Sequence, residues 1–369
     1  MSHLVLLGGG HAHMTTLAGL DSFVRAGHKV SVVGPSEYHY YSGMGPGMLG
    51  GTYQPQDIRF HTRRVVEKKG GIFIVDAAVH IDPKAQVVHL KSGQKLAYDV
   101  LSCNVGSYVP DKHPSDNSIP SFTVKPISGL IAARDTFLDL AKRKPLNIAI
   151  VGGGPSAAEI AGNLLQLAKQ FRLSPPRINI FAGGGFIKGF PSLVIELIER
   201  SLSKRGVEFI LDYSNRIQAG HILTTGGQWY EADMVFMCTG VRPSPIFKDS
   251  GIETGPDNGM LVNRFLQSVQ YDTIFGGGDC IYFQDQPLDK VGVYAVRQNQ
   301  VLFKNLAARL DGKPLQAFDP GGKYLLIFNL GEKSGVLHKG SLTLSGKPAF
   351  YCKHFIDKKF MRKFQAYEK

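Results

Sequence analysis

The chain carries one three-part pattern twice, and this repeat constrains its fold more than any other feature. In each copy an apolar run leads into a glycine-rich turn, and the turn leads into an amphipathic segment. A buried parallel strand, a tight turn and a helix give this pattern. The first copy begins with the run at 4–7 and the second, about 145 residues later, with the run at 147–151. Repetition at this scale predicts two similar units.

The first copy predicts a complete βαβ unit. A strand at 4–7 enters the turn Gly8-Gly-Gly-His-Ala-His13, and a helix at 14–26 leads to a second strand at 29–33. Glycines in such a turn let the backbone approach a pyrophosphate, whose charge the amides at the helix N-terminus then bind. This unit is therefore a candidate dinucleotide site.

Two positions of the first unit depart from the usual dinucleotide pattern. His13 occupies the third glycine position, where a small residue lets the helix pack closely, and Gly34 replaces the acid that binds a ribose hydroxyl. A unit that has lost its nucleotide is the competing interpretation. A later segment favours a retained ligand, because an apolar run ends in Gly276-Gly-Gly-Asp279 and such a carboxylate can accept hydrogen bonds from a sugar alcohol.

The second copy follows the dinucleotide pattern more closely. A strand at 147–151 enters the turn Gly152-Gly-Gly-Pro-Ser-Ala157, whose third position is a small residue, and a helix at 158–171 leads to a strand at 177–181. This copy predicts a site for a pyridine nucleotide.

The acid expected after the strand at 177–181 is missing. Ala182-Gly-Gly-Gly185 follows instead, so a preference for NADH over NADPH is not implied. Lys188 either neutralises a 2′-phosphate or lies in solvent.

The remaining segments complete two doubly wound, Rossmann-like α/β domains, the second inserted in the first. Alternating residues at 71–79 and 86–90 predict antiparallel strands, and stretches containing proline at 109–121 and 241–245 predict two crossings between the domains. The predicted division is 1–110 with 241–318 for the FAD-binding domain, 111–240 for the NAD(P)-binding-like domain, and 319–369 for a short C-terminal α+β segment.

Composition restricts the partners. The net charge of +12 suits an anionic partner or an ordinary basic enzyme, but no nucleic-acid-binding motif accompanies it. The four cysteines form no CxxC pair, so neither a zinc framework nor a disulfide scaffold is indicated and a reducing compartment fits best. No apolar run approaches the roughly 20 residues of a membrane span. We expect a cytoplasmic protein, soluble or peripheral at the inner face of the cell membrane.

Four further segments carry a resemblance to a known family. They are Gly8-Gly-Gly-His-Ala-His13, Tyr41-Ser-Gly-Met-Gly-Pro-Gly47, Val293-Tyr-Ala-Val-Arg-Gln298 and Ile356-Asp-Lys-Lys-Phe-Met-Arg362. The chain resembles the pyridine nucleotide–disulfide oxidoreductase superfamily, on the branch of type II NADH dehydrogenases and sulfide:quinone oxidoreductases. It is similar above all to the FAD-dependent oxidoreductase found fused to selenophosphate synthase. The resemblance covers nearly the whole chain and implies FAD as cofactor, with NAD(P)H as a candidate co-substrate.

The resemblance also implies positions around the cofactor. The turn glycines of the first unit should lie at the pyrophosphate of FAD, and Asp279 should bind the ribityl chain. The segment 40–44 and the helix that begins at 293–298 should lie beside the flavin ring. The implied cofactor contacts are Gly8, Gly10, His11, His13, Ser42, Gly43, Met44, Gly106, Gly152, Gly154, Pro155, Ser156, Gly240, Gly278, Asp279 and Tyr294.

Three side chains are candidates for catalysis, and each has a structural alternative. Glu159 either relays protons or orders water where flavin meets nicotinamide, or it is an acid favoured near a helix N-terminus. By resemblance, Arg297 and Gln298 donate to the flavin pyrimidine or to a quinone oxygen; the alternative is that they are surface residues of a helix.

Thiol and metal chemistry are disfavoured. Disulfide reductases of the superfamily carry a CxxxxC pair early in the FAD domain, and this sequence has none. Sulfide oxidases need a cysteine pair beside the flavin, yet no cysteine occurs between Cys103 and Cys238. His11 and His13 lack further ligands at metal spacing, so we expect a phosphate contact or a packing role and no metal.

The C-terminal segment predicts a basic amphipathic helix. Cys352, Ile356, Phe360 and Phe364 recur every four residues and share one face, which lysines and arginines surround. Such a helix docks on its own domain, pairs across a homodimer, or lies at an anionic membrane surface.

The predicted function is that of an FAD-dependent oxidoreductase that passes electrons from a soluble donor, NAD(P)H, to an acceptor, by resemblance a quinone. Two alternatives stay open. One is a flavoenzyme of selenium or sulfur metabolism that does not use NAD(P)H, and the other is a non-catalytic FAD-binding module whose redox state controls a partner.

Overall fold

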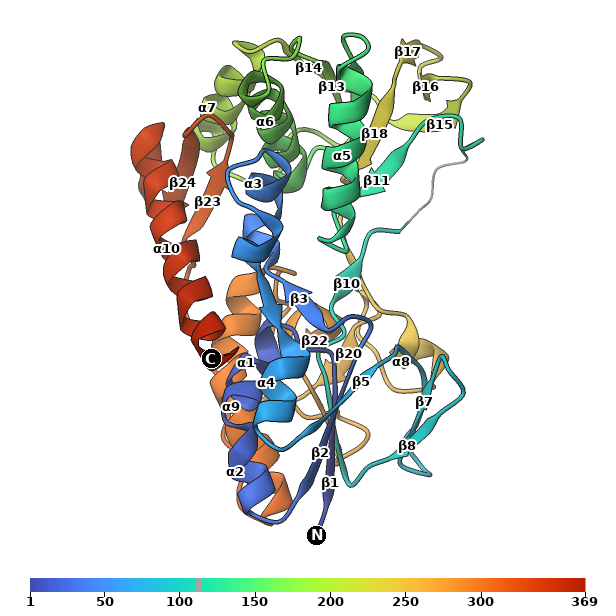
Figure 1. Ribbon diagram of the computed structural model, residues 1–369, viewed down its shortest axis with the longest axis vertical. Coiled ribbons are helices and arrows are strands. Elements are labelled where there is room, and N and C mark those ends of the chain that lie inside the picture. Colours follow the sequence, from blue (N-terminus) through green and yellow to red (C-terminus); the bar gives the residue numbers. More distant parts are fainter. Residues whose placement is uncertain (111–114, 369) are drawn as a thin grey trace.

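Two five-stranded parallel sheets organise the chain in the computed structural model, which describes residues 1–110 and 115–368 (Figure 1). The first repeat forms the centre of the first sheet, whose order is β21-β9-β1-β2-β5. Its strands are apolar throughout because both faces of an all-parallel sheet are covered. The strands are β1 (His3–Leu7), β2 (Lys29–Gly34), β5 (Ile72–Val75), β9 (Val100–Cys103) and β21 (Ile274–Gly276).

The first sheet joins segments that are far apart in sequence. Leu4 of β1 pairs with Val30 of β2 on one side and with Val100 of β9 on the other. β21 then pairs in parallel with β9, although residues 104–273 separate them. The sheet is therefore discontinuous in sequence, as the inserted arrangement requires.

The helix predicted at 14–26 is wrong in one respect, because it is two helices. They are α1 (Met14–Ala18) and α2 (Leu20–Arg25), preceded by the 3-10 turn η1 (His11–His13). Gly19 separates them and lies against α9 (Gly292–Leu310), where a Cβ would be 2.9 Å from the ring of Phe303. Close packing on α9 thus requires the glycine that interrupts the helix.

The second repeat forms the second sheet, in the order β11-β18-β12-β13-β14. The predicted strands at 147–151 and 177–181 are confirmed as β12 and β13. The helix begins at Pro155 rather than at residue 158, since a proline suits the first helical turn. The elements are β11 (Ser121–Thr123), α5 (Gly129–Ala141), β12 (Asn147–Val151), α6 (Pro155–Gln170), β13 (Arg177–Phe181), α7 (Ser192–Ser203), β14 (Val207–Ile210) and β18 (Met234–Met237).

The segment 71–79, predicted as one antiparallel strand, is divided between two sheets. β5 pairs in parallel with β2, whereas β6 (Ala78–Asp82) pairs with β7 (Val87–Leu90) in an antiparallel sheet that β8 (Lys95–Ala97) completes. The change of sheet occurs at Asp76, whose Oδ1 accepts a hydrogen bond of 2.7 Å from the amide of Ala77. The prediction was correct only for the second part of the segment.

The two crossing segments meet. β10 (Ser107–Tyr108) pairs in antiparallel fashion with β19 (Arg242–Pro243), Ser107 opposite Pro243. Of the crossing predicted at 109–121, residues 111–114 lie outside the described residues. The domain limits at 110, 240 and 318 stay a prediction.

The C-terminal segment forms a three-stranded antiparallel sheet and a long helix, α10 (Lys347–Gln365), which runs along one side of the molecule past both sheets (Figure 1). The helix docks on its own chain through Phe350, Asp357, Met361 and Phe364. The predicted apolar face is wrong in part, because Ile356 is 42% exposed. The strands are β23 (Leu326–Asn329), β24 (Gly335–Lys339) and β25 (Leu342–Ser345).

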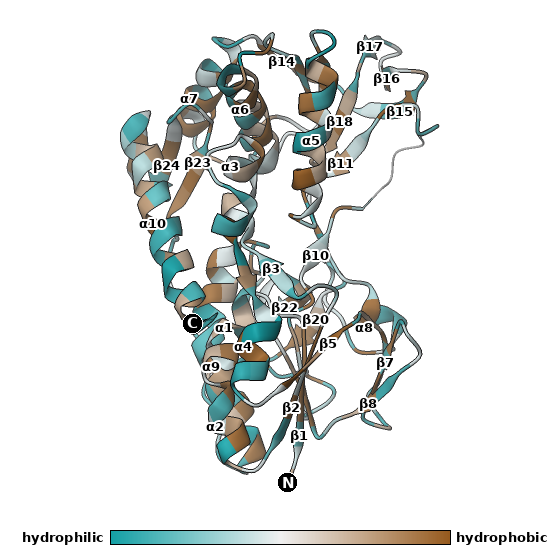
Figure 2. Ribbon diagram, viewed as in Figure 1, coloured by the Kyte–Doolittle hydropathy of each residue, from teal (hydrophilic) through white to brown (hydrophobic). Residues whose placement is uncertain are grey.

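The apolar residues gather in two cores, one around each large sheet (Figure 2). α3 (Gly45–Leu49) comes from the N-terminal part of the chain, yet it packs against α5 and α6 of the second unit. Within the described residues, no helix is both long enough and apolar enough to cross a membrane.

Shorter elements complete the chain. They are β3 (Tyr38–Tyr40), η2 (Ser42–Met44), η3 (Pro55–Ile58), β4 (Arg59–His61), α4 (Thr62–Lys68), β15 (Ser214–Gln218), β16 (His221–Thr224), β17 (Trp229–Glu231), α8 (Ile246–Asp249), β20 (Met260–Val262), η4 (Gly278–Cys280), β22 (Ile281–Phe283) and η5 (Ala366–Glu368).

Candidate active site

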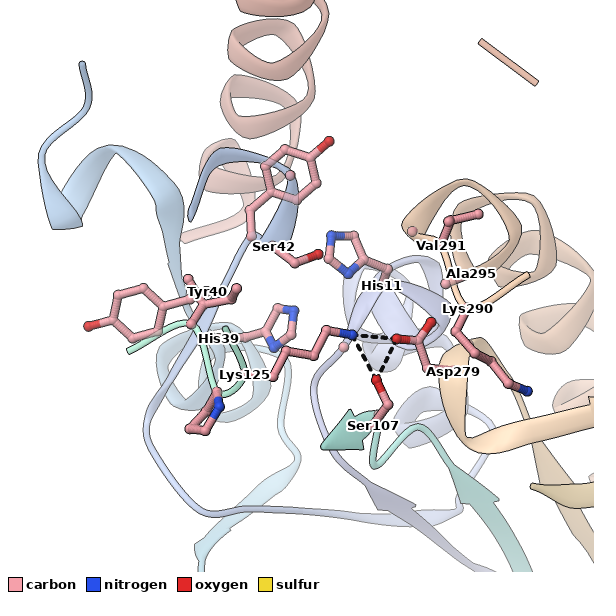
Figure 3. A pocket seen from close by; sticks show the side chains of 18 of the residues that line it. His11, His39, Tyr40, Ser42, Ser107, Lys125, Asp279, Lys290, Val291 and Ala295 are labelled. Atoms are coloured by element: carbon pink, nitrogen blue, oxygen red, sulfur yellow. Dashed lines mark hydrogen bonds and ion pairs between the residues drawn. The ribbon is translucent and has the colours of Figure 1, made fainter. Parts of the chain in front are cut away.

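A cavity of 1520 Å³ lies at the carboxyl ends of the first sheet and extends to α6 of the second unit and to α10. Open α/β sheets bind ligands at this edge. Figure 3 shows part of it, with His11, His39, Ser42, Lys125 and Asp279 around the same space. Chain segments that contribute to its wall are 7–11, 33–36, 38–43, 104–107, 124–128, 155–156, 159–160, 240–241, 278–279, 290–293, 295–297, 323–327 and residues of α10.

The first glycine turn is a close-fitting backbone cradle at the cavity wall. Gly8 has φ +88°, and a Cβ there would lie 2.3 Å from the carbonyl oxygen of Asn104. A Cβ at Gly10 would lie 2.1 Å from Oδ1 of the same asparagine, an atom that is buried without a hydrogen-bond partner in the described part of the chain. Only glycines permit this approach, which leaves turn backbone and an unpartnered acceptor at the wall.

His13 explains why the third glycine is dispensable. Its Nδ1 lies 2.6 Å from the carbonyl oxygen of Gly8 and its Nε2 lies 2.8 Å from Oγ of Ser102. The side chain is 0% exposed, and burial lowers its pKa to about 4. His13 therefore ties the turn to β9 from below and does not line the cavity.

His11 and His39 present two neutral imidazoles at the cavity. Their ring centroids are 5.3 Å apart, and His11 also stacks on Phe360 of α10. Burial lowers the pKa of His11 to about 3 and that of His39 to about 4. Nε2 of each is buried without a hydrogen-bond partner among the described residues. Buried polar atoms are normally paired, so these two atoms mark a place for a polar ligand.

Asp279 lies at the centre of a charged group. Its Oδ2 is 2.5 Å from Nζ of Lys125 and accepts a hydrogen bond of 2.7 Å from Oγ of Ser107. Burial favours a raised pKa for Asp279, but the charge of Lys125 and its hydrogen bond outweigh it and hold the pKa below the usual range. The carboxylate is therefore ionised and available to a hydroxyl donor.

A second polar group lines the cavity near α10. The hydroxyl of Tyr41 donates to Oδ1 of Asp357 at 3.0 Å, and Oδ2 of Asp357 lies 3.2 Å from Nζ of Lys353. Glu159 accepts a hydrogen bond of 2.8 Å from the amide of Asn329. Burial raises the pKa of Glu159 against the opposing charge of Lys353. Burial lowers the pKa of Lys353, but Asp357 and Glu159 raise it further. These are acid–base groups in one cavity wall.

The side chains of α9 have different positions from one another. Arg297 lines the cavity, where its guanidinium donates to the carbonyl oxygens of Pro320 and Gly322. Gln298 is 1% exposed and its Oε1 accepts a 2.6 Å hydrogen bond from the amide of Gly278. Gln298 thus supports the turn at Asp279, and its predicted contact with a substrate stays untested.

The cavity brings most of the predicted site residues together. Gly8, Gly10, His11, Ser42, Gly43, Gly106, Pro155, Ser156, Glu159, Gly240, Gly278, Asp279 and Arg297 line it. His13 and Met44 are buried beside it, Tyr294 and Gln298 lie at a small adjoining pocket, and Gly152 and Gly154 lie in the turn before α6.

Five lining residues were missed by the sequence-based prediction: Tyr41, Lys125, His39, Lys353 and Asp357. Tyr41 lies within a predicted segment but was not singled out. Lys353 and Asp357 are four residues apart, which places them on one helix face, and this spacing was a usable signal. Lys125 and His39 belong to no motif.

Two dinucleotide-binding units that share a cavity define a nucleotide-dependent oxidoreductase. A family model described as pyridine nucleotide-disulphide oxidoreductase matches residues 2–300, and the chain belongs to this family. A type II NADH:quinone oxidoreductase of Staphylococcus saprophyticus is 24% identical over 383 residues, covering 96% of this chain and 94% of that protein. Ferroptosis suppressor protein 1 of Taeniopygia guttata is 26% identical over 283 residues, or 72% and 71% of the two chains.

Solved structures share the fold over the whole chain. The sulfide:quinone oxidoreductase from the hyperthermophilic bacterium Aquifex aeolicus matches with a TM-score of 0.82 and 19% identity, covering 100% of this chain and 92% of that one. NDH2 from Plasmodium falciparum, determined in complex with NADH, has a TM-score of 0.80 and 14% identity and covers 99% of both chains. The predicted superfamily, its branch and the Rossmann-like fold class are confirmed.

The chain is therefore an oxidoreductase with FAD as cofactor and NAD(P)H as co-substrate. The residues present fit FAD. The glycine cradle, the unpartnered Oδ1 of Asn104 and the carboxylate of Asp279 follow one another along a cavity of 1520 Å³. All four cysteines are free, and three of them are buried.

Proposed function

We propose that this protein oxidises NAD(P)H and reduces a quinone at a single FAD. The observation that carries the proposal is the cavity itself, which extends from the first glycine turn past Pro155 and Ser156 of α6 to the acid–base groups of α10. Bound FAD would accept a hydride and release electrons singly or in pairs. A quinone also needs protons when it is reduced, and the α10 side of the cavity holds groups that can supply them.

The chain's own residues would bind and orient the cofactor. The backbone of Gly8 and Gly10 would approach the pyrophosphate, and the amides that follow would face its charge. The carboxylate of Asp279 would accept hydrogen bonds from the ribityl hydroxyls, with Ser107 and Lys125 fixing its orientation. Gln298 holds the amide of Gly278 and so keeps this turn in place.

Glu159 is the proposed proton donor on the acceptor side. Burial raises its pKa, so its carboxyl holds a proton more readily than an exposed glutamate does. Lys353 and Asp357 lie in the same wall and would replace that proton through Tyr41 or solvent. Arg297 is the proposed positioning residue, because its guanidinium is anchored by two backbone carbonyls.

The first test is an anaerobic titration of the FAD-loaded protein with NADH and, separately, NADPH, followed by addition of a water-soluble quinone. Rapid stoichiometric bleaching of the flavin and recovery on adding quinone are expected. Glu159→Gln keeps the size and removes the acid, so it should bleach normally and recover at least tenfold more slowly. Bleaching without recovery by quinone would refute the acceptor. No bleaching by either nucleotide would refute the donor and favour the selenium or sulfur enzyme or the redox-sensing module.

A peripheral membrane contact is the second part of the proposal, since quinones reside in membranes. Leu342 and Leu344 of β25 are 52% and 44% exposed, and Tyr351 and Phe355 of α10 are 50% and 68% exposed. β25 and α10 are in contact, so these apolar side chains lie on neighbouring elements of a segment rich in lysine. Exposed apolar residues beside cations suit an anionic lipid surface. Homodimer formation and localisation at the inner face of the membrane stay predictions.

A further inference from the structure

The second glycine turn faces a residue that bears on which dinucleotide it accepts. Ala182 follows β13, and its Cβ lies 2.9 Å from the place where a Cβ on Gly153 would be. The side chain therefore points at the turn. In dinucleotide folds the acid at this place binds the ribose 2′-hydroxyl of NADH, and its charge opposes the 2′-phosphate of NADPH. Ala182 can do neither.

Asp212, which follows the neighbouring strand β14, does not replace the missing acid. Its Oδ1 accepts hydrogen bonds from the amide of Tyr213 at 2.7 Å and from the hydroxyl of Thr225, and its Oδ2 accepts from the amide of Gly226 at 2.8 Å. These bonds, led by that of Thr225, lower the pKa of Asp212 to about 2. The carboxylate is thus committed to the loop between β14 and β15 and to the turn between β16 and β17.

Tyr213 provides an aromatic surface at the same edge. Its Cγ lies 2.5 Å from the place of a Cβ on Gly183, and its hydroxyl lies 3.3 Å from the corresponding place on Gly184. The side chain therefore extends along the two glycines that follow Ala182, and the residue is 59% exposed. Exposed aromatic rings stack on nucleotide bases with little selectivity. Lys188 is exposed in the same loop and adds a cation.

We infer that this site accepts NADPH at least as well as NADH, with Tyr213 stacking on the adenine and with no acid at position 182 to oppose the 2′-phosphate. The inference rests on the proposed function for the role of the dinucleotide as electron donor. The adenosine subsite can be tested without turnover, by the binding of 2′,5′-ADP and of 5′-ADP.

The experiment measures kcat/KM for NADPH and NADH with one quinone, and the calorimetric Kd of both ADP isomers, on the FAD-loaded protein. We expect a wild-type NADPH-to-NADH ratio of at least unity. Ala182→Glu should lower this ratio about tenfold or more, because like charges oppose each other. Ala182→Gln has the same size without the charge and should keep the ratio. A wild-type preference for NADH, or equal effects of the two substitutions, would overturn the inference.

Tyr213 is tested separately, so that a failure of Ala182→Glu to fold leaves the inference open to refutation. Tyr213→Ala should weaken the binding of both ADP isomers roughly tenfold, and Tyr213→Phe should bind as wild type does. Unchanged binding by Tyr213→Ala would overturn the stacking role. If neither dinucleotide reduces the flavin but 2′,5′-ADP binds through Tyr213, the proposed function fails and the subsite stands. If 2′,5′-ADP does not bind, the inference fails regardless of turnover.

Discussion

The hydroxyl of Tyr41 donates a hydrogen bond of 3.0 Å to Oδ1 of Asp357, so a loop near the start of the chain is joined to the helix near its end. Asp357 is 3% exposed and also pairs with Lys353. The contact makes α10 part of the cavity wall. Two of its consequences concern stability and lipid binding, and two further predictions concern the charged and neutral groups near FAD.

Removing the carboxylate of Asp357 should destabilise the protein. Asp357→Ala leaves Lys353 largely buried without its partner, which costs about 3 kcal/mol in comparable cases. Urea unfolding of the FAD-loaded protein measures this loss. Lys359→Ala, an exposed change on the same helix, should stay within about 0.5 kcal/mol of wild type. A loss for Asp357→Ala no larger than that of Lys359→Ala would show that Lys353 does not depend on Asp357.

Lys125 should set the pH at which FAD is released. Asp279 binds as a carboxylate, and its pKa is held down by Lys125 against the effect of burial. The ion pair is intact above this lowered pKa and is lost as the pH falls through it. Lys125→Met should raise the pKa of Asp279, so FAD fluorescence should appear at a higher pH during acid titration. Lys84→Met, at an exposed lysine, is the control. Identical release curves for Lys125→Met and wild type would contradict this role.

Buried histidine should make stability fall on mild acidification. Burial lowers the pKa of His13 from 6.5 to about 4, so the folded state resists protonation that the unfolded chain accepts. Its contribution is complete above pH 6.5 and declines by about 1.4 kcal/mol per pH unit as the pH falls towards 4. His13→Gln should reduce the slope by that amount in urea unfolding at saturating FAD. Ser102→Ala keeps the histidine and should keep the slope. A slope unchanged by His13→Gln would disprove the assignment.

The apolar residues of α10 should bind anionic vesicles. Tyr351→Ser with Phe355→Ser removes two aromatic side chains that are 50% and 68% exposed, and co-sedimentation should weaken at least tenfold. Trp229→Ser is the matched control, because Trp229 is 53% exposed on β17, which lies far from α10 in Figure 1. Added salt should weaken binding by wild type. Equal losses for the double variant and Trp229→Ser would argue against a lipid-binding surface on α10.

The repeated units could be predicted because their signals are local. The apolar runs at 147–151 and 177–181 are strands with those limits, and the glycine turns are where backbone must approach backbone. Gly19 gave no warning of a broken helix, because its necessity comes from Phe303 of a helix far along the chain. The division of 71–79 between two sheets depends likewise on partner strands that periodicity does not reveal.

The site was predicted where a motif carried it and missed where tertiary contacts built it. Asp279 and Glu159 follow glycine motifs, and both line the cavity. Lys125 reaches Asp279 only because β11 brings it to the crossing, and no local pattern marks it. The burial of Asp357 depends on which face of α10 docks, which helical spacing alone leaves open. Hydrophobic periodicity favoured the face with Ile356 and so gave less weight to the polar residues beside it.

The ribbon formed by β10 and β19 has a mechanical consequence. Ser107 pairs with Pro243 across the two crossings, and the same residue donates from its hydroxyl to Asp279. The two connecting strands cannot slide independently without breaking this pairing. A rotation of the unit that receives the dinucleotide would therefore be transmitted as a torque through Ser107 to the carboxylate beside the flavin, so that nucleotide arrival and cofactor alignment are geared together by one serine.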